Sequence, residues 1–186
     1  MENCWSATEK ENGMSEPSQK RKILARLNAL RTKEARAAFT RCCGAVVWAE
    51  AMAARRPFAS WERLEAASES LWPALTERDW KEAFAHHPQI GDLDALRAKF
   101  GATRQWVTGE QAGTAAASEQ VLQALAEGNA AYRERFGYIF IVCATGKSAD
   151  EMLALLRARL CNDPDTEIAA AAAEQQKITR LRLEKM

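Results

Sequence analysis

Two adjacent histidines, His86 and His87, are the first candidates for chemistry in this sequence. Neighbouring side chains on a helix diverge by about 100°, so the two rings do not point at one metal ion. The sequence also lacks the H-x-x-x-H, H-E-x-x-H and cysteine–histidine spacings of metal ligands. We therefore expect no metal site, and we expect any chemistry of these residues to be acid–base chemistry.

His87 directly precedes Pro88, and the residue before a proline is pushed out of the helical region. His87 is therefore expected at the end of a helix, where the negative end of the helix dipole raises the pKa of a histidine. A proton donor that works near neutral pH needs such a pKa. The alternative is an ordinary structural histidine with satisfied hydrogen bonds, and the local sequence by itself favours that alternative.

The segment Thr108-Gly109-Glu110-Gln111 has the pattern of a capping box at the start of a helix. Thr108 would accept a hydrogen bond from the first turn, and the Gln111 side chain would bond back to the cap. Glu110 would then lie at the positive end of the helix, which favours its ionised carboxylate. Both side chains are common at helix starts, so neither one indicates a function by itself.

An arginine in the last predicted helix is less easily explained by helix formation alone. Plotting side chains at about 100° per residue places Arg182 in the middle of the apolar arc of that helix. The apolar residues of this arc are Ile168, Ile178, Leu181 and Leu183. A buried guanidinium needs an anionic partner, because an unpaired buried charge is very costly. We expect that partner to be either a protein carboxylate such as Glu110 or the carboxylate of a substrate.

The segment from Phe136 to Ala144 departs from the helical character of the chain, because its residues are mostly aromatic or β-branched. The chain has no second segment of this kind that could pair with it as a strand. We interpret it either as an extended stretch that crosses the core or as a buried helix start. Extended backbone would leave N–H and C=O groups that require partners, and a bound polar ligand would supply them.

The cysteines are interpreted as reduced thiols. They are Cys4, Cys42, Cys43, Cys143 and Cys161, an odd number that contains no C-x-x-C pair. Cys143 could act as a nucleophile, but burial in an apolar segment would raise its pKa. We therefore interpret Cys143 as a structural residue.

The elements that must position these residues are helical. From Lys20 onward, apolar residues recur at intervals of three and four, the spacing of helices with one buried face. Helix starts are marked by Thr32, Ser60, Thr76, Ser148 and the pair Asp163-Pro164. We predict an all-α protein, with a single compact domain of about seven or eight helices and one extended core segment over residues 18–186. Residues 1–17 are polar and have no apolar period, so we expect a disordered N-terminal tail.

Composition argues against several kinds of partner. The chain has 186 residues with 26 basic and 25 acidic side chains, so no strong field draws it to nucleic acid. No apolar run reaches the roughly 20 residues that span a bilayer, and the first residues lack a secretory signal pattern. We therefore expect no nucleic-acid partner, no membrane partner and a cytoplasmic location.

Five segments, taken together, resemble the 2-oxo-4-hydroxy-4-carboxy-5-ureidoimidazoline (OHCU) decarboxylase family in their order and spacing. They are Arg56-Pro57-Phe58, His87-Pro88-Gln89-Ile90-Gly91, Glu110-Gln111, the segment 136–144 and Lys177-Ile178-Thr179-Arg180-Leu181-Arg182-Leu183. The resemblance runs from about Leu27 to the C-terminus. It implies an all-α enzyme, usually a homodimer, that releases CO2 to give (S)-allantoin in urate breakdown and uses no cofactor.

The same resemblance implies roles for individual residues. His87 would be the catalytic histidine, with Glu110 as its acidic partner. Gln111 and Arg182 would bind polar groups of a small-molecule substrate beside Pro88. The backbone of one further segment would bind the substrate ring, and its residues are Phe140, Ile141, Val142, Cys143 and Ala144. We hypothesise that His87 donates a proton to one face of the ring after CO2 has left.

Two positions depart from the family pattern. Where the family commonly has a serine three residues before the glutamate, this chain has Val107, and Thr108 would have to supply the hydroxyl as a further substrate contact. Where the family has a proline in the aromatic segment, this chain has Ile139. Two other functions stay open on the residues alone: a non-catalytic helical interaction module, and a thiol enzyme that uses Cys143.

Overall fold

The computed structural model of the chain describes residues 16–87 and 111–186, and the side chains of residues 17–87 and 119–186. These residues form eight α-helices and one short 3-10 helix, with no strand among them. The elements are α1 (Glu16–Ala29), α2 (Thr32–Cys43), α3 (Val46–Ala54), α4 (Trp61–Leu71), η1 (Trp72–Ala74), α5 (Glu77–Ala85), α7 (Gln111–Phe136), α8 (Ala149–Arg159) and α9 (Pro164–Glu184). The predicted all-α class is confirmed.

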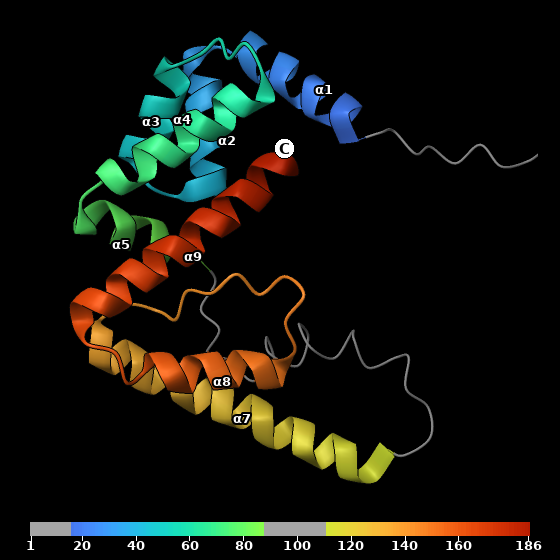
Figure 1. Cartoon of the computed structure of the whole chain (residues 1–186), viewed down its shortest axis with the longest axis vertical. Coiled ribbons are helices and arrows are strands. Elements are labelled where there is room, and N and C mark those ends of the chain that lie inside the picture. Colours follow the sequence, from blue (N-terminus) through green and yellow to red (C-terminus); the bar gives the residue numbers. More distant parts are fainter. Residues whose placement is uncertain (1–15, 88–110) are drawn as a thin grey trace, which may run out of the picture.

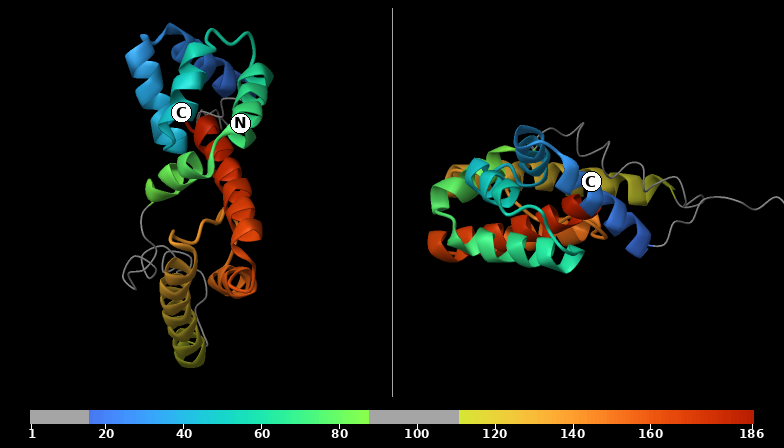
Figure 2. Two further views of the ribbon diagram at one scale, coloured as in Figure 1. Left: turned by 90° about the vertical axis from the view of Figure 1, so that its left-hand side faces the viewer. Right: turned by 90° about the horizontal axis from the view of Figure 1, so that it is seen from above.

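The helix α9 connects two groups of helices (Figures 1 and 2). Helices α1 to α5 gather at one end of the molecule, and α7 and α8 lie side by side at the other. The helix α9 begins near α8 and runs back to α2 and α5, against which it packs. Residues far apart in the sequence therefore meet along α9.

The end of α2 is sharply defined, and it lies in the core of the larger group of helices. The buried positions of α2 are Ala35, Ala38, Phe39, Cys42 and Cys43, at helical spacing. The Phe39 ring contacts Trp48 of α3 edge to face, with the ring centroids 5.9 Å apart. Gly44 ends the helix in the left-handed conformation (φ +94°), and its N–H bonds to the Thr40 carbonyl. The last carbonyls of α2 are thus left for partners outside the helix.

Most predicted helix starts are confirmed by side-chain caps. Ser60, Thr76, Ser148 and Asp163 each accept a hydrogen bond from a backbone N–H of the first turn that follows. The cap of α2 is Arg31 rather than Thr32, because Glu34 bonds back to the backbone and side chain of Arg31. The predicted box at Thr108 lies outside the described residues.

The N-terminal boundary differs slightly from the predicted one. The helix α1 begins at Glu16, two residues before the predicted start of the domain. Pro17 falls in its first turn, where the N–H that proline lacks would have no helical partner. The predicted disorder of the preceding residues falls outside the described residues and stays a prediction.

The segment after α7 is buried without regular structure, as the extended interpretation predicts. Residues 137–144 form neither helix nor strand. The alternative of a buried helix start is therefore wrong. The buried residues of the segment are Tyr138, Phe140, Ile141, Val142 and Cys143. Tyr132 of α7 packs against Phe140 with the ring centroids 5.2 Å apart, and Tyr138 packs against Phe84 of α5 at the same separation. The segment thus fills the space between α7 and α5 with aromatic rings.

The buried face of α9 contains more polar residues than the apolar arc predicted from the sequence. Its buried residues are Glu167, Ala171, Ala172, Gln175, Thr179 and Leu183. Ile168 and Ile178 are only half-buried, so the stripe is rotated away from the predicted arc. Arg182 is also half-buried and lies beside Leu183 and Thr179 on the packed side of the helix. The polar residues of this face build the candidate site.

Candidate active site

His87 lies just beyond α5, with its ring half-buried against α9. His86 caps α5, and the His87 N–H bonds to the Phe84 carbonyl in a final turn. The His87 Nε2 atom is 2.5 Å from Oε1 of Gln175, a side chain that is 0 % exposed. The predicted position of His87 at a helix end is therefore confirmed, and a buried amide of α9 holds the ring.

Gly44 allows the end of α2 to approach the end of α5 closely. A Cβ atom on Gly44 would lie 2.8 Å from the Cβ atom of His86, closer than such atoms approach in proteins. The left-handed φ of Gly44 also disfavours any other residue there. The two helix ends meet because position 44 carries no side chain.

The pKa of His87 is lowered from its ordinary value of 6.5, contrary to the sequence prediction. Burial of the ring is the main cause, because it disfavours the charged form. The positive charge of Arg182 lowers the pKa further, and the hydrogen bond to Gln175 raises it by less. The prediction considered only the helix end, whereas the tertiary neighbours outweigh it. His87 is therefore mainly neutral at neutral pH.

Arg182 is bound at the end of α2 and acts electrostatically on His87. Its Nη1 donates to the Cys42 carbonyl at 3.1 Å. This carbonyl replaces the protein carboxylate that the sequence suggested as partner, while Glu110 lies outside the described residues. Arg182 also lines a hollow of about 440 Å³. The other lining residues are Arg26, Ala38, Arg41, Cys42, Lys185 and Met186. The cations around this hollow make it suitable for an anionic group.

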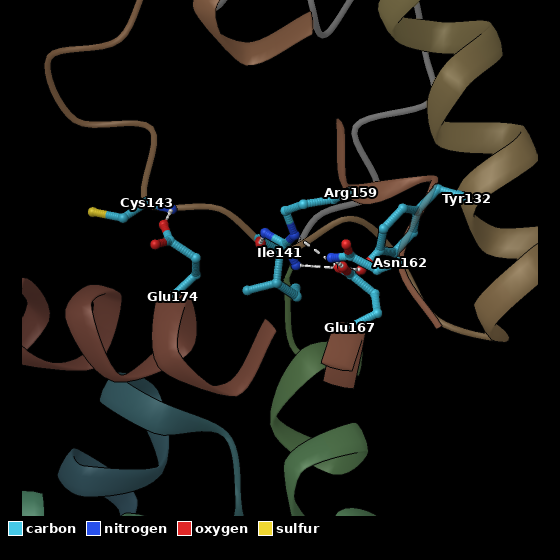
Figure 3. Close-up of polar contacts among 7 residues, drawn as sticks. All are labelled: Tyr132, Ile141, Cys143, Arg159, Asn162, Glu167 and Glu174. Carbon is cyan, nitrogen blue, oxygen red and sulfur yellow. Dashed lines mark hydrogen bonds and ion pairs between the residues drawn. The ribbon is translucent and has the colours of Figure 1, made fainter. Parts of the chain in front are cut away.

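The backbone of the aromatic segment is bonded to side chains of the protein (Figure 3). The Cys143 N–H donates to a Glu174 carboxylate oxygen at 2.7 Å, and the Cys143 carbonyl accepts from Lys147 at 2.8 Å. The Ile141 carbonyl accepts from Nη1 of Arg159 at 2.7 Å. Side chains therefore satisfy three of the backbone groups for which the sequence suggested a bound ligand.

A buried carboxylate organises the other side of the segment (Figure 3). Glu167 is 0 % exposed and accepts hydrogen bonds from Tyr132, Arg159 and Asn162. Burial and the bond to Glu167 raise the pKa of Tyr132 far above its usual range, so its hydroxyl stays a donor. The Arg159 guanidinium also lies over the Phe140 ring, 4.8 Å from the ring centroid. This network joins α7, α8, α9 and the aromatic segment.

Sequence reasoning missed both Gln175 and Glu167. Glu167 is in the first turn of α9, where acidic residues are ordinary, and Gln175 is a polar residue among alanines and glutamines. The only available signal was helical spacing, because residues 167, 171, 175 and 179 follow one another at intervals of four. That spacing places three polar residues on one face, yet it does not reveal that the face is buried.

The structure describes only some of the predicted site residues. Pro88, Thr108 and Glu110 lie outside the described residues, and Gln111 is the first residue of α7 with an undescribed side chain. Among the described ones, Arg182 acts electrostatically on His87. Of the backbone set, Phe140, Ile141, Val142 and Cys143 are buried, and Ala144 is half-buried.

The described part of the chain has neither a metal-binding cluster nor a membrane-spanning helix. There, no group of three or more histidine, cysteine, aspartate or glutamate side chains is arranged to hold a metal ion. Nor does any helix within the described ranges have the length and apolar character to cross a membrane.

The cysteines at 42, 43, 143 and 161 are free thiols. Burial raises the pKa of Cys42 to about 12 and that of Cys43 to about 11, so neither is a reactive thiolate.

Comparison with known proteins identifies this helical fold as that of a decarboxylase. The profile of the OHCU decarboxylase family matches residues 28–184. The chain belongs to the OHCU decarboxylase family. The 2-oxo-4-hydroxy-4-carboxy-5-ureidoimidazoline decarboxylase of Amia calva is 33% identical over 144 residues, which cover 74% of this chain and 78% of that protein.

A plant protein and two solved structures extend the similarity. The uric acid degradation bifunctional protein TTL of Arabidopsis thaliana is 39% identical over 145 residues, which are 78% of this chain but 45% of that protein. A crystal structure of OHCU decarboxylase in the presence of (S)-allantoin matches with a TM-score of 0.62 and 37% identity, covering 79% of this chain and 94% of that one. A crystal structure of (S)-allantoin synthase shares the fold, with a TM-score of 0.61 and 20% identity over 86% of this chain and 52% of that one.

Proposed function

We propose that this chain decarboxylates 2-oxo-4-hydroxy-4-carboxy-5-ureidoimidazoline to (S)-allantoin and CO2 in urate degradation, with His87 as the residue that moves the proton. Membership in the family supports the reaction. One observation supports the role of His87. Buried Gln175 binds its ring through a hydrogen bond, and the positive charge of Arg182 acts on it. Charged and hydrogen-bonded surroundings of this kind occur around acid–base residues.

The substrate determines which bonds change. Its carboxylate and hydroxyl share one ring carbon, and the ureido group is on the neighbouring unsaturated carbon. When CO2 leaves, the electron pair of the broken bond forms a double bond between these two carbons. The electrons of the former C=N bond move onto nitrogen, which takes a proton from water. The resulting enol then loses its hydroxyl proton and gains a proton on the ureido-bearing carbon, which gives allantoin.

A neutral His87 suits the last of these steps. Its lowered pKa leaves the ring with a free lone pair, which accepts the proton of the enol hydroxyl. The imidazolium then gives a proton to the neighbouring carbon from one side, which gives a single stereoisomer. His87 is still the proton donor, as hypothesised from the sequence. The proton that it donates comes from the substrate hydroxyl rather than from an imidazolium present before the reaction.

Arg182 is proposed to bind the anionic groups of the substrate. Its half-buried guanidinium has only a backbone carbonyl as its described hydrogen-bond partner, so its charge is available to an anion. The substrate carboxylate, and the negative charge that moves onto the ring, are suitable partners. Glu110 is proposed to orient His87 or the substrate hydroxyl. The remaining proposed contacts are Pro88, Thr108, Gln111 and the backbone of residues 140–144.

We also propose that the chain is a homodimer that uses no metal or cofactor, as the family resemblance implies, and that it acts in the cytoplasm. Sedimentation of the purified chain tests the oligomeric state, and a monomer at micromolar concentration would contradict the proposed dimer. Activity that survives extensive dialysis against a chelator tests the absence of a metal requirement.

The substitution His87→Asn tests the proposed role of His87. Acid–base catalysis contributes roughly 10²- to 10⁴-fold to a rate, so the catalysed reaction should slow by about that factor. The substrate decays spontaneously, so the product that still appears should be racemic. Circular dichroism follows (S)-allantoin as it forms in a mixture with urate oxidase and the hydrolase that acts next.

Thermal unfolding of His87→Asn serves as the control for correct folding. A folded His87→Asn protein that still makes pure (S)-allantoin at the wild-type rate would end the assignment of His87. A non-catalytic interaction module would instead leave the spontaneous, racemic reaction unchanged with either protein.

A further inference from the structure

The hydrogen bonds of Gln175 determine which end of its amide faces His87. Its Nε2 atom is 3.3 Å from the Cys43 carbonyl oxygen and 3.2 Å from Oγ1 of Thr179. A carbonyl oxygen only accepts hydrogen bonds, so the amide group that faces Cys43 must be the NH2 donor. The other end of the amide, Oε1, therefore faces the His87 ring, 2.5 Å from its Nε2 atom.

This orientation in turn determines where the His87 ring carries its hydrogen. An amide oxygen only accepts, so the imidazole Nε2 must be a donor. We infer that Gln175 is a positioning residue that holds neutral His87 in the Nε2–H tautomer, which makes Nδ1 the atom that accepts and releases the proton. The inference rests on the proposed role of His87 in the reaction.

The opposite tautomer would be unfavourable in this site. It would bring the lone pair of Nε2 against the lone pairs of Oε1 at 2.5 Å and leave a buried acceptor without a donor. Rotating the amide by half a turn would not help, because Oε1 would then face the Cys43 carbonyl. The protein therefore holds one tautomer, as a catalytic histidine requires.

Glutamine suits this position because it has a donor group and an acceptor on one side chain. The donor is used at the end of α2, where the Cys43 carbonyl has no partner within its own helix. Thr179, one turn further along α9 and 2 % exposed, takes the second N–H. Asparagine would be shorter by one methylene, and glutamate would lack the donor. The site thus needs both the length and the amide of Gln175.

The bond to Gln175 also acts on the charge of His87. Because Oε1 accepts a hydrogen bond from the protonated ring as well, it favours the imidazolium and offsets part of the effect of burial. Two groups act in the opposite direction and lower the pKa of His87: Arg182 on α9, and His86, the preceding residue. Loss of the bond should therefore lower the pKa of His87 and weaken its preference for one tautomer.

The experiment measures the tautomer directly in the full-length protein. Two-dimensional NMR that correlates imidazole nitrogens with ring protons distinguishes the two neutral tautomers, and the His87→Asn spectrum assigns the signals, since only two histidines are present. Wild-type His87 above its pKa should show a protonated Nε2 and an unprotonated Nδ1. Gln175→Met should show a mixture of tautomers and a lower pKa of His87.

Kinetics of the same variants complete the test. We expect Gln175→Met to reduce kcat roughly ten- to hundredfold, the worth of one buried hydrogen bond, with KM changed by less than about twofold. Gln176→Met is the matched control, because Gln176 faces a different hollow with Glu65 and Arg180 and should behave as wild type. Gln175→Glu retains an acceptor, so it should keep the Nε2–H tautomer and raise the pKa of His87.

Two outcomes would overturn the inference: a wild-type His87 that carries its hydrogen on Nδ1, or a folded Gln175→Met protein with unchanged tautomer and unchanged kcat. Even if Gln175→Met fails to fold, the wild-type spectrum and Gln175→Glu still decide. The proposed role of His87 fails separately, if His87→Asn is fully active. In that case an Nε2–H tautomer would mean that the bond is structural only.

Discussion

His87 shows how tertiary neighbours set the chemistry of a single residue. Its position at a helix end predicted a raised pKa, yet burial and Arg182 lower it. The same environment binds the ring through Gln175, so the residue is mainly neutral and fixed in orientation at neutral pH. Both properties suit a group that first takes a proton and then returns it.

The lowered pKa of His87 makes stability depend on pH, with a definite sign. The unfolded chain takes up this proton near pH 6.5, the folded protein only at lower pH. Between the pKa of His87 in the folded protein and its value in the unfolded chain, the unfolded state binds more protons, so the free energy of unfolding rises with pH. The contribution of His87 to this rise is complete above about pH 6.5. Urea unfolding between about pH 5 and 7 should therefore show that wild type loses more stability than His87→Asn as the pH falls.

The difference between the two proteins isolates the histidine, because the carboxylates with lowered pKa are common to both. Those groups, Glu174 and Asp163 among them, titrate below their ordinary values of 4.5 and 3.8, outside this range. Parallel curves for wild type and His87→Asn would contradict the lowered pKa of His87.

At the scale of elements, α9 joins the two halves of the candidate site. Its first turn carries Glu167 and fixes the aromatic segment through Arg159, whose guanidinium bonds to the Ile141 carbonyl. Two turns later Gln175 holds His87, and near its end Arg182 is bound to α2. A substitution in the first turn of α9 should therefore change the position of the backbone segment 140–144, which is proposed to contact the substrate.

Arg159→Met should be strongly destabilising because it leaves a fully buried carboxylate without its counter-charge. Glu167 is 0 % exposed, and Arg159 forms an ion pair with it. Breaking such a buried pair costs about 3–5 kcal/mol, which chemical unfolding measures. The matched control is Arg157→Met, an exposed residue of the same helix, which should change stability by less than about 0.5 kcal/mol.

The pair Arg159→Met and Glu167→Gln, combined, separates the charge from the hydrogen bonds. Asn162 and Tyr132 bond to different oxygens of Glu167. The glutamine oxygen still accepts from Asn162, its NH2 group can donate to the Tyr132 hydroxyl, and the uncompensated charge is gone. The double variant should therefore be more stable than Arg159→Met alone. A double variant that is less stable than the single one would show that the network depends on hydrogen-bond geometry rather than on charge.

At the scale of the whole molecule, three distant parts of the chain build the site. The end of α2 contributes two backbone carbonyls, the end of α5 contributes His87, and α9 contributes Gln175 and Arg182 (Figure 1). Such a site exists only in the folded chain. A ligand that fits it should therefore stabilise the folded state as a whole.

The melting temperature should rise with added (S)-allantoin, the proposed product. A ligand present at 100 times its Kd adds about 2.7 kcal/mol to the free energy of unfolding. Thermal unfolding with each enantiomer should give the larger rise for (S)-allantoin. Arg182→Met should reduce that rise, whereas Arg180→Met, an exposed residue of α9 paired with Glu65, should retain it. No rise at any concentration would favour a non-catalytic interaction module.

Local sequence signals predicted the helices well because they depend on neighbouring residues. The caps at Ser60, Thr76, Ser148 and Asp163 follow from side-chain oxygens next to free N–H groups. The irregular aromatic segment was likewise predictable from its β-branched and aromatic residues. The site was predictable only in part. His87 and Arg182 were singled out, while Gln175 and Glu167 were not, because a polar residue at helical spacing looks the same whether its face is buried or exposed.

The sequence alone determined the all-α class, the capped starts of four helices, and, through ordered motifs, the family. Tertiary structure decided the direction of the pKa shift of His87, the partner of Arg182 and the groups that satisfy the aromatic segment. The physical reason is range: caps and periodicity act within one or two turns, whereas burial and charge depend on residues brought together from opposite ends of the chain. Gln175 and Cys43 are 132 positions apart, yet their bond sets which end of the buried amide faces Nε2 of His87.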